Sequence, residues 1–149
     1  MKHTTEVMIS AEEISQKLDQ MAEQINAHYA NSERLLMVGL LKGSVVFMAD
    51  LCAVLKAMLK SILCRFELCS RDVKVLKDVQ SRYRARDVLI VEDLIDSGNT
   101  LNKVREMLGC KSRLYPVFNY PDEFIVGYGI DYAEQYRNLP YIAKVVPLE

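Results

Sequence analysis

The residues best suited to chemistry lie in one short segment, EDLIDSGNT, at residues 92–100. The acidic pair Glu92 and Asp93 comes directly after an apolar run at residues 88–91. Such a run is typical of a strand buried on both faces of a parallel sheet. The strand would place two carboxylates at the carboxyl edge of the sheet, where ligands bind in open α/β proteins. Because buried charges need partners, the pair indicates a cation or a ligand with hydroxyl groups.

A group of small or polar residues follows the acidic pair: Asp96, Ser97, Gly98, Asn99 and Thr100. An amphipathic segment comes next, which predicts a helix. Backbone amides that converge in front of a helix can hold a phosphate group. An ordinary turn with an N-cap is the alternative for an isolated Ser-Gly-Asn segment, but the neighbouring acids favour a phosphate site. The segment predicts a pocket for a phosphorylated sugar, with carboxylates for ribose hydroxyls or Mg²⁺.

The surrounding sequence alternates between helix and strand patterns, as in an α/β protein. Ser10 and Glu13 form a capping box, and apolar residues recur behind it at helical spacing. The apolar run at residues 35–41 predicts a buried strand, and residues 45–59 predict a helix that is apolar nearly all round and therefore buried. Further strands are expected at residues 62–68, 124–126 and 142–146, whereas residues 71–79 fit a strand or a helix.

Length and composition favour one cytoplasmic domain spanning residues 1–149. The chain has 149 residues, half of them hydrophobic, which is enough for one core. The four cysteines lack CxxC spacing and follow no secretory signal, so we expect a reduced cytoplasmic protein. We expect no membrane span, because no apolar run is long enough. His3 and His28 lie outside every motif and are expected at the surface or at a helix end.

Charge is unevenly distributed along the chain. The formal net charge is −1, but residues 56–86 hold nine Lys or Arg against three Asp or Glu. A solvated face is the common explanation, and a basic rim that attracts a polyanionic substrate is the alternative. Nucleic-acid binding is not expected, because the pI is near 6.1 and no aromatic platform is interleaved with the basic residues.

The segment VLIVEDLIDSGNT at residues 88–100 resembles the phosphoribosyl pyrophosphate signature of the type I phosphoribosyltransferases. Five other segments resemble the hypoxanthine phosphoribosyltransferases of bacteria, in family order: MKHTTEVMIS at 1–10, LLKGS at 40–44, MADLC at 48–52, RDVKVLKD at 71–78 and PDEFIVGYGIDYAEQYRNLPYI at 121–142. Receiver domains also have a strand that ends in adjacent acids, but there the pair lies near the start of the domain. The resemblance implies an α/β fold with a mainly parallel central sheet, flanking helices and a small hood formed by the chain ends.

The resemblance also implies a reaction. Members of the family bind Mg²⁺ and phosphoribosyl pyrophosphate, and a purine nitrogen then displaces pyrophosphate from the sugar. The partners would be phosphoribosyl pyrophosphate and a 6-oxopurine, in a homodimer or homotetramer. The preferred purine stays open among hypoxanthine, guanine and xanthine.

Residue roles follow from the match to family positions. Asp96 would accept a proton from the purine, and Glu92 and Asp93 would hold ribose hydroxyls and Mg²⁺. The 5′-phosphate would be bound by Ser97, Gly98, Asn99 and Thr100. The pyrophosphate would be bound by Lys42, after a cis peptide, by Gly43 and by Arg137. The purine would contact Phe124, the backbone of Ile125, and Asp131, which would also reach Mg²⁺.

Two internal departures separate the chain from the family pattern. ELCSRDV joins the strand near Phe66 directly to residues 71–78, without the mobile Ser-Tyr loop that closes the family's site. After Leu108, GCKSRLYPVFNYPDEF replaces a strand and a DKPSRR-like loop, of which Lys111 would be a remnant. We therefore expect a physical protein longer than this sequence, which an intact mass of 17.1 kDa would contradict. A chain of this length would have impaired specificity and turnover.

Two functions are therefore compared. The first is a purine salvage enzyme that makes a nucleoside monophosphate, for which the intact Asp96 argues. The alternative is a non-catalytic regulator or sensor that retains the phosphoribosyl pocket, for which the missing loop argues. Salt-dependent RNA binding at physiological ionic strength would favour the regulator.

Overall fold

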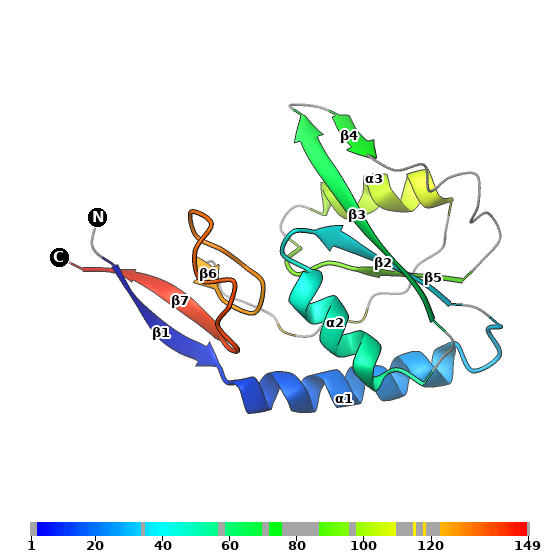
Figure 1. The fold of residues 1–149 in the computed structure, drawn as a ribbon, viewed down its shortest axis with the longest axis horizontal. Helices are drawn as coiled ribbons and strands as arrows, with labels where there is room; N and C mark the ends of the chain where they lie inside the picture. Colours follow the sequence, from blue (N-terminus) through cyan, green and yellow to red (C-terminus); the bar gives the residue numbers. More distant parts are fainter. Residues whose placement is uncertain are drawn as a thin grey trace.

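The computed structural model describes residues 3–33, 35–56, 59–69, 72–75, 87–95, 98–109, 115, 118 and 123–148, with the backbone alone for 59–69 and 72–75. The elements form a four-stranded central sheet and a three-stranded smaller sheet. Figure 1 shows the smaller sheet and both chain ends to one side of the central sheet, with α1 reaching from one to the other. The predicted α/β architecture is confirmed.

The central sheet has the strand order β4-β3-β2-β5. Its strands are β2 (Leu35–Leu41), β3 (Leu59–Cys69), β4 (Asp72–Val75) and β5 (Asp87–Val91). β2 pairs in parallel with β3 and β5, and β4 pairs antiparallel with β3. Because Gly39 of β2 lies opposite Val91 of β5, these two strands end at the same edge of the sheet. The loops that follow them can therefore build one site.

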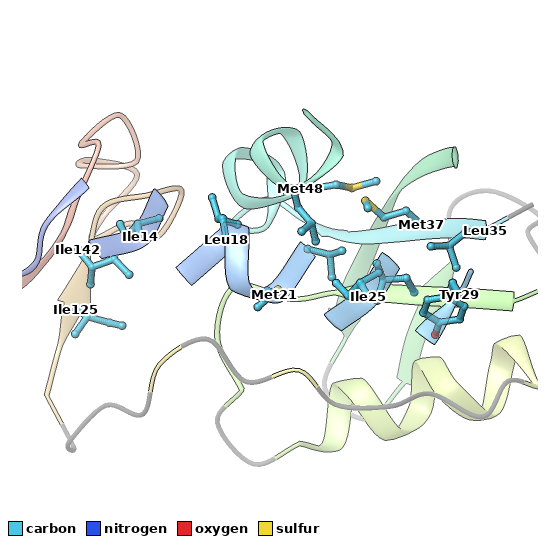
Figure 2. Close-up of a cluster of buried hydrophobic side chains, with 13 residues drawn as sticks. Ile14, Leu18, Met21, Ile25, Tyr29, Leu35, Met37, Met48, Ile125 and Ile142 are labelled. Atoms are coloured by element: carbon cyan, nitrogen blue, oxygen red, sulfur yellow. The ribbon is translucent and has the colours of Figure 1, made fainter. Parts of the chain in front are cut away.

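Helices cover both faces of the central sheet. α1 (Ala11–His28) and α2 (Val45–Val54) lie on one face, and α3 (Asn99–Leu108) lies on the other (Figures 1 and 2). The capping box is confirmed at the start of α1, where the Ser10 hydroxyl accepts the Glu13 N–H at 3.2 Å and the Glu13 carboxylate accepts the Ser10 N–H at 2.8 Å. Figure 2 shows the core that α1 and α2 form with β2, including Met21, Met37 and Met48.

The chain ends form the smaller sheet, which we call the hood. Its order is β1-β7-β6, with β1 at His3–Ile9, β7 at Ile142–Pro147 and β6 at Ile125–Val126, all antiparallel. Ile125 and Ile142 of the hood belong to the same core cluster as Ile14 in the first turn of α1 (Figure 2). The start of α1 therefore joins the hood to the rest of the molecule, and the predicted hood is confirmed.

The prediction for residues 45–59 is wrong in two respects. α2 ends at Val54, because Leu55 takes an extended conformation and the Lys56 N–H donates to the Asn26 side-chain oxygen at 3.0 Å. β3 then begins at Leu59. Because the apolar residues continue from the helix to Leu59, the sequence pattern does not mark the boundary between helix and strand. The helix is also not buried all round, since Met48 and Leu51 are its buried residues and Val45 is exposed.

The remaining predicted elements agree with the structure where it describes them. Residues 62–68 lie within β3. Of the segment that fitted a strand or a helix, residues 72–75 form the strand β4, and residues 71 and 76–79 lie outside the described residues. Lys111 also lies outside the described residues. His28 is the last residue of α1, as expected. In the part of the chain that the structure describes, every helix is too short or too polar to span a membrane.

Candidate active site

The loop after β2 forms a tight turn at the edge of the central sheet. The peptide bond between Leu41 and Lys42 is cis, as the family resemblance implies. Gly43 and Ser44 are buried, and the Ser44 hydroxyl donates to the carbonyl of Leu40. This bond closes the turn, so that α2 begins at Val45.

The acidic edge, which we define as Glu92 and Asp93, lies against this turn. A Cβ atom on Gly43 would overlap the Asp93 carboxylate, so the backbone and the carboxylate are in direct contact. Any larger residue at position 43 would have to displace the carboxylate or the turn. The two predicted site segments, after β2 and after β5, are thus brought together by the parallel register of their strands.

The surroundings of Glu92 in the acidic edge disfavour its charged form. Glu92 and Asp93 are half-buried, and the Asp93 N–H donates to Glu92 Oε1 at 3.3 Å. Burial, together with the hydrogen bond and the like charge of the Asp93 side chain, raises the pKa of Glu92 to about 9, although the backbone N–H of Asp93 acts in the opposite direction. A bound cation reverses this effect, because it favours the ionised form of both carboxylates. The oxygen donors of the acidic edge therefore suit a hard divalent ion.

The loop between β6 and β7, residues 127–141, folds back on itself, and we call it the hood loop. Gly127 bridges to Ile130, and Tyr132 bridges to Gln135, through pairs of backbone hydrogen bonds of 2.9–3.2 Å. Arg137 is held by this backbone, because its Nη1 donates to the carbonyl of Gly129 at 2.8 Å. The loop is therefore shaped by its own hydrogen bonds.

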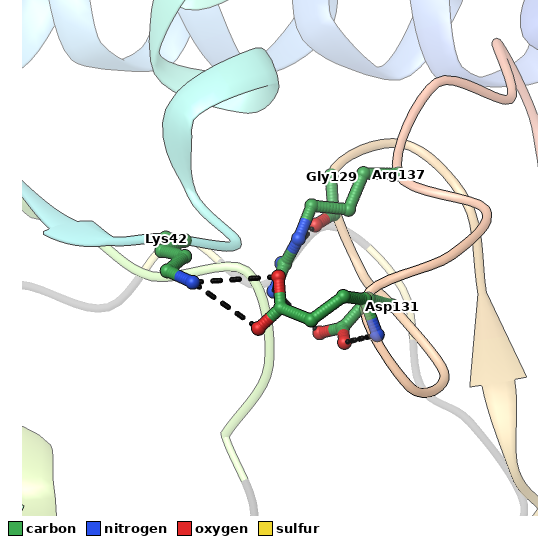
Figure 3. A network of polar contacts seen from close by, with 5 residues as sticks. Lys42, Gly129, Asp131 and Arg137 are labelled. Atoms are coloured by element: carbon green, nitrogen blue, oxygen red, sulfur yellow. Dashed lines mark hydrogen bonds and ion pairs between the residues drawn. The ribbon is translucent and has the colours of Figure 1, made fainter.

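Two predicted residues, Asp131 and Arg137, pair with each other in the hood loop. Arg137 Nη2 lies 2.7 Å from Asp131 Oδ1, and Asp131 Oδ2 accepts the Glu134 N–H at 2.8 Å (Figure 3). The Glu134 carboxylate reaches Lys42 Nζ in the turn after β2, at 3.1 Å (Figure 3). The network therefore connects the hood loop to the central sheet.

Backbone packing also connects the hood loop to the turn after β2. Gly129 lies so close to Gly43 that a Cβ atom on Gly129 would overlap the Gly43 carbonyl oxygen. The φ angle of Gly129 is +98°, which also favours glycine. Gly43 therefore lies between Asp93 on one side and the hood loop on the other, and three segments of the candidate site meet there.

The two predicted purine contacts differ in burial. The Phe124 side chain is 64% exposed, and its ring packs edge-on against Tyr132 with the ring centroids 5.5 Å apart. The Ile125 side chain is buried in the core, which leaves its backbone as the part able to contact a ligand. An exposed, oriented aromatic ring of this kind offers a face for stacking.

The predicted phosphate segment is described in part. Gly98 precedes α3 with φ +73°, and the helix begins with Asn99 and Thr100. A helix N-terminus at this point agrees with the expected anion site. Asp96 and Ser97 lie outside the described residues.

The structure brings Lys42, Gly43 and Asp93 together, and the hood loop adds Asp131 and Arg137 to the same neighbourhood. It does not gather all the predicted metal ligands, since the described residues contain no group of three or more His, Cys, Asp or Glu side chains able to hold a metal. Mg²⁺ is commonly held by one or two carboxylates together with substrate phosphates and water, which needs no such group.

Two contacts of the site were not predicted from the sequence. Glu134, which bridges Lys42 and Arg137, stands three residues before Arg137, and that spacing was the available signal. The hydroxyl of Tyr128 donates to the Asp50 carboxylate of α2 at 2.7 Å. Burial and this acidic neighbour raise the pKa of Tyr128, so the hydroxyl remains a donor.

Known proteins share both the sequence and the fold. The phosphoribosyl transferase domain family matches residues 8–111, more than half of the chain. The chain is 46% identical to the hypoxanthine phosphoribosyltransferase of Salmonella typhimurium, over 100% of this chain and 99% of that protein. The hypoxanthine-guanine phosphoribosyltransferase of Bacillus subtilis is 37% identical, over 99% of this chain and 97% of that protein.

The chain belongs to the hypoxanthine phosphoribosyltransferase family. A crystal structure of a hypoxanthine-guanine phosphoribosyltransferase from Bacillus anthracis has a TM-score of 0.87 and 34% identity, and the match covers 97% of this chain and 100% of that one. A crystal structure of a hypoxanthine phosphoribosyltransferase from Staphylococcus aureus has a TM-score of 0.84 and 33% identity, with 95% of this chain and 93% of that one covered. Phosphoribosyltransferases generally need a divalent metal.

The alignment with the Salmonella hypoxanthine phosphoribosyltransferase also contains gaps. It spans 177 positions, which is 28 more than the 149 residues of this chain, although it covers the whole chain. The additional positions are therefore internal gaps, at which the Salmonella protein has residues that this chain lacks. This agrees with the internal departures from the family pattern in the sequence.

Proposed function

We propose that this chain transfers the phosphoribosyl group from phosphoribosyl pyrophosphate to hypoxanthine, giving inosine monophosphate and pyrophosphate. Guanine and xanthine are further candidate bases. The observation that carries the proposal is the meeting of three predicted site segments at Gly43, in a chain 46% identical to a hypoxanthine phosphoribosyltransferase. The names of the relatives favour an enzyme over the regulator, because those matched along the whole chain are transferases.

The phosphoribosyl pyrophosphate would lie along the carboxyl edge of the central sheet. Its 5′-phosphate would be held at the start of α3 by Ser97, Gly98, Asn99 and Thr100, where backbone N–H groups and the helix dipole favour an anion. Its pyrophosphate would be held by the backbone of Lys42 and Gly43 and by the side chain of Arg137, a planar group that suits phosphate oxygens.

The acidic edge would hold the ribose hydroxyls and Mg²⁺, with Asp131 as a further carboxylate for the ion. The raised pKa of Glu92 supports this assignment, because two adjacent carboxylates are more stable when a cation is shared between them. Bound Mg²⁺ would supply positive charge that offsets the charge of the departing pyrophosphate.

The chain's own carboxylates would then act on the sugar and on the base. Positive charge develops on the anomeric carbon as the bond to pyrophosphate breaks, and the negative field of Glu92 and Asp93 stabilises it. Asp96 would accept the proton that the purine loses. The exposed ring of Phe124 would stack on the base, and the backbone of Ile125 would contact its edge.

We further propose that residues 1–149 act as one functional domain, because the site draws on both the central sheet and the hood. We also propose that the protein acts in the cytoplasm. A homodimer or homotetramer is proposed from the family. The exposed apolar residues of α2, such as Val45, support it, since this surface would be covered in an assembly.

The test is Mg²⁺-dependent formation of inosine monophosphate by purified protein with an intact mass of 17.1 kDa, measured beside Asp96→Asn. We expect activity in the wild type and a loss of about 100-fold or more in kcat for the variant, as for the removal of a general base. Asp19→Asn, an exposed change on α1, is the control and should retain activity. A folded wild type with no activity on any 6-oxopurine would exclude the proposal.

A further inference from the structure

One carboxylate of the hood loop lies between two cations of the candidate site, the side chains of Lys42 and Arg137. Glu134 Oε1 and Oε2 lie 3.1 Å and 3.3 Å from Lys42 Nζ, and Glu134 Oε2 lies 3.6 Å from Arg137 Nη2. Lys42 and Glu134 are 92 residues apart in sequence, so the tertiary fold creates this contact (Figure 3). Glu134 is thus the anion that these two cations share in the structure.

The backbone at Glu134 is unusual for a residue with a side chain. Ala133 and Glu134 have φ angles of +50° and +62°, in the middle of the turn that pairs Tyr132 with Gln135. Such turns favour glycine or asparagine, and each other residue costs about 1–2 kcal/mol there. A glutamate held in this conformation, with its N–H on Asp131, points to a role for its side chain.

The chemistry of the two cations defines what could replace that carboxylate. A guanidinium and an ammonium side by side bind an anion with several oxygens, and carboxylate and diphosphate are alternatives of the same kind. Glu134 is mostly exposed, as is Lys42, so the pair can separate at small cost. A diphosphate that approached these cations would have to displace the Glu134 carboxylate.

We infer that Glu134 is an internal competitor for the diphosphate group. In the free protein its carboxylate holds Lys42 and Arg137, and it takes them back as pyrophosphate leaves. The inference rests on the proposed function for the identity of the diphosphate ligand. It assigns Glu134 to product release, as a positioning residue that acts through the two cations.

The first experiment titrates pyrophosphate, in the presence of MgCl₂, into wild-type protein and Glu134→Gln by calorimetry. Removal of the competing charge should tighten pyrophosphate binding by about two- to fivefold, the range expected for an exposed ion pair. Product inhibition by pyrophosphate should become stronger by the same factor. Glu6→Gln is the matched control, because it breaks another exposed ion pair of the hood, Glu6 with Lys144 at 3.2 Å, and should bind pyrophosphate as the wild type does.

A double-mutant cycle tests whether Glu134 acts through Lys42. The gain in affinity from Glu134→Gln should shrink when Lys42→Gln is already present, because one of the two contested cations is gone. An undiminished gain would show a general charge effect and overturn the inference. Unchanged or weaker pyrophosphate binding in Glu134→Gln would also overturn it.

A second variant keeps the test valid if Glu134→Gln folds poorly. Glu134→Asn tolerates the left-handed backbone and shortens the side chain, so it should give the same gain in affinity. The proposed function is judged separately, by formation of inosine monophosphate in the wild type. If the wild type is inactive but the variants bind pyrophosphate more tightly, the proposed function fails and the competition for diphosphate stands.

Discussion

The hood loop and the acidic edge both contain carboxylates, but the hood loop also contains an arginine that pairs with them. In the hood loop, Arg137 lies 2.7 Å from Asp131 and holds the carbonyl of Gly129. At the acidic edge, burial and then the neighbouring Asp93 carboxylate raise the pKa of Glu92 to about 9. The hood loop thus pairs its arginine with its own Asp131, whereas the acidic edge gains when a cation binds.

The two regions are therefore prepared for binding in different ways. Hydrogen bonds fix the hood loop before a ligand arrives, which lowers the ordering cost of binding. The acidic edge keeps carboxylates whose ionised forms are stabilised on binding. Gly43 touches both regions, so changes there should affect them together.

The largest expected effect comes from Gly43→Ala, which acts on both regions at once. The added methyl group must displace the Asp93 carboxylate or the turn that bears Lys42. A displacement of about 1 Å in a site can cost about 100-fold in kcat/KM, and we expect a loss of that order. Steady-state kinetics with both substrates measures it.

Gly109→Ala is the control for the exchange of glycine for alanine. Gly109 has φ +59°, and its added Cβ would meet open space. It should therefore lower the free energy of unfolding by about 1–2 kcal/mol and leave kcat/KM unchanged. Equal kinetic losses in the two variants would show that the contact of Gly43 with Asp93 is not specific.

A smaller effect is expected from Arg137→Gln, which acts on the hood loop alone. The variant removes the charge-assisted bonds to Asp131 and Gly129, interactions worth about 1.5–3 kcal/mol. We expect kcat/KM for phosphoribosyl pyrophosphate to fall by about tenfold or more. Lys144→Gln, which removes another cation of the hood, should have no such effect, and an equal loss in both would refute the specific role of Arg137.

The smallest effect is expected at the start of α1, which joins the hood to the rest of the molecule. Ser10→Ala removes the cap and should lower the free energy of unfolding by about 1 kcal/mol, measured by denaturant titration at pH 7. Ser32→Ala, just beyond the other end of α1, should have little effect. A Ser10 variant as stable as the wild type would show that the capping box adds nothing to this joint.

The capping box also predicts a pH dependence. The hydrogen bonds from Ser10 lower the pKa of Glu13, so the folded protein binds fewer protons there than the unfolded chain. Its stabilising effect is complete above the ordinary pKa of a glutamate and is lost as the pH falls through the lowered pKa. The difference in stability between wild type and Glu13→Gln, which removes the titrating group, should therefore shrink in acid.

The sequence predicted the parts of the fold that depend on local patterns. The capping box of α1 and the strands β2 and β5 follow from spacing and apolar runs within a few residues. The end of α2 was missed, because it depends on the Asn26 side chain, 30 residues before Lys56. Hydropathy alone continues through that point, and a distant hydrogen bond cannot be read from it.

In the candidate site, too, the parts that depend on local motifs were predictable from the sequence, and the contacts between distant segments were not. The acidic pair and the hood loop residues were identified by motif, and the register of β2 with β5 explains why Lys42 and Asp93 share one edge. The pairing of Glu134 with Lys42 was not predictable, because it depends on how the hood sits on the sheet. The close approach of Gly129 to Gly43 is hidden for the same reason.

The two ends of β5 allow the location of the active site to be tested. β5 begins with the exposed Asp87 and is followed at its other end by Asp93. Mg²⁺-dependent synthesis of inosine monophosphate should fall by about 100-fold in Asp93→Asn, the size of a lost electrostatic contact in a transition state, and stay at the wild-type rate in Asp87→Asn. Full activity in Asp93→Asn, or equal losses in both variants, would contradict an active site at the carboxyl edge of the sheet.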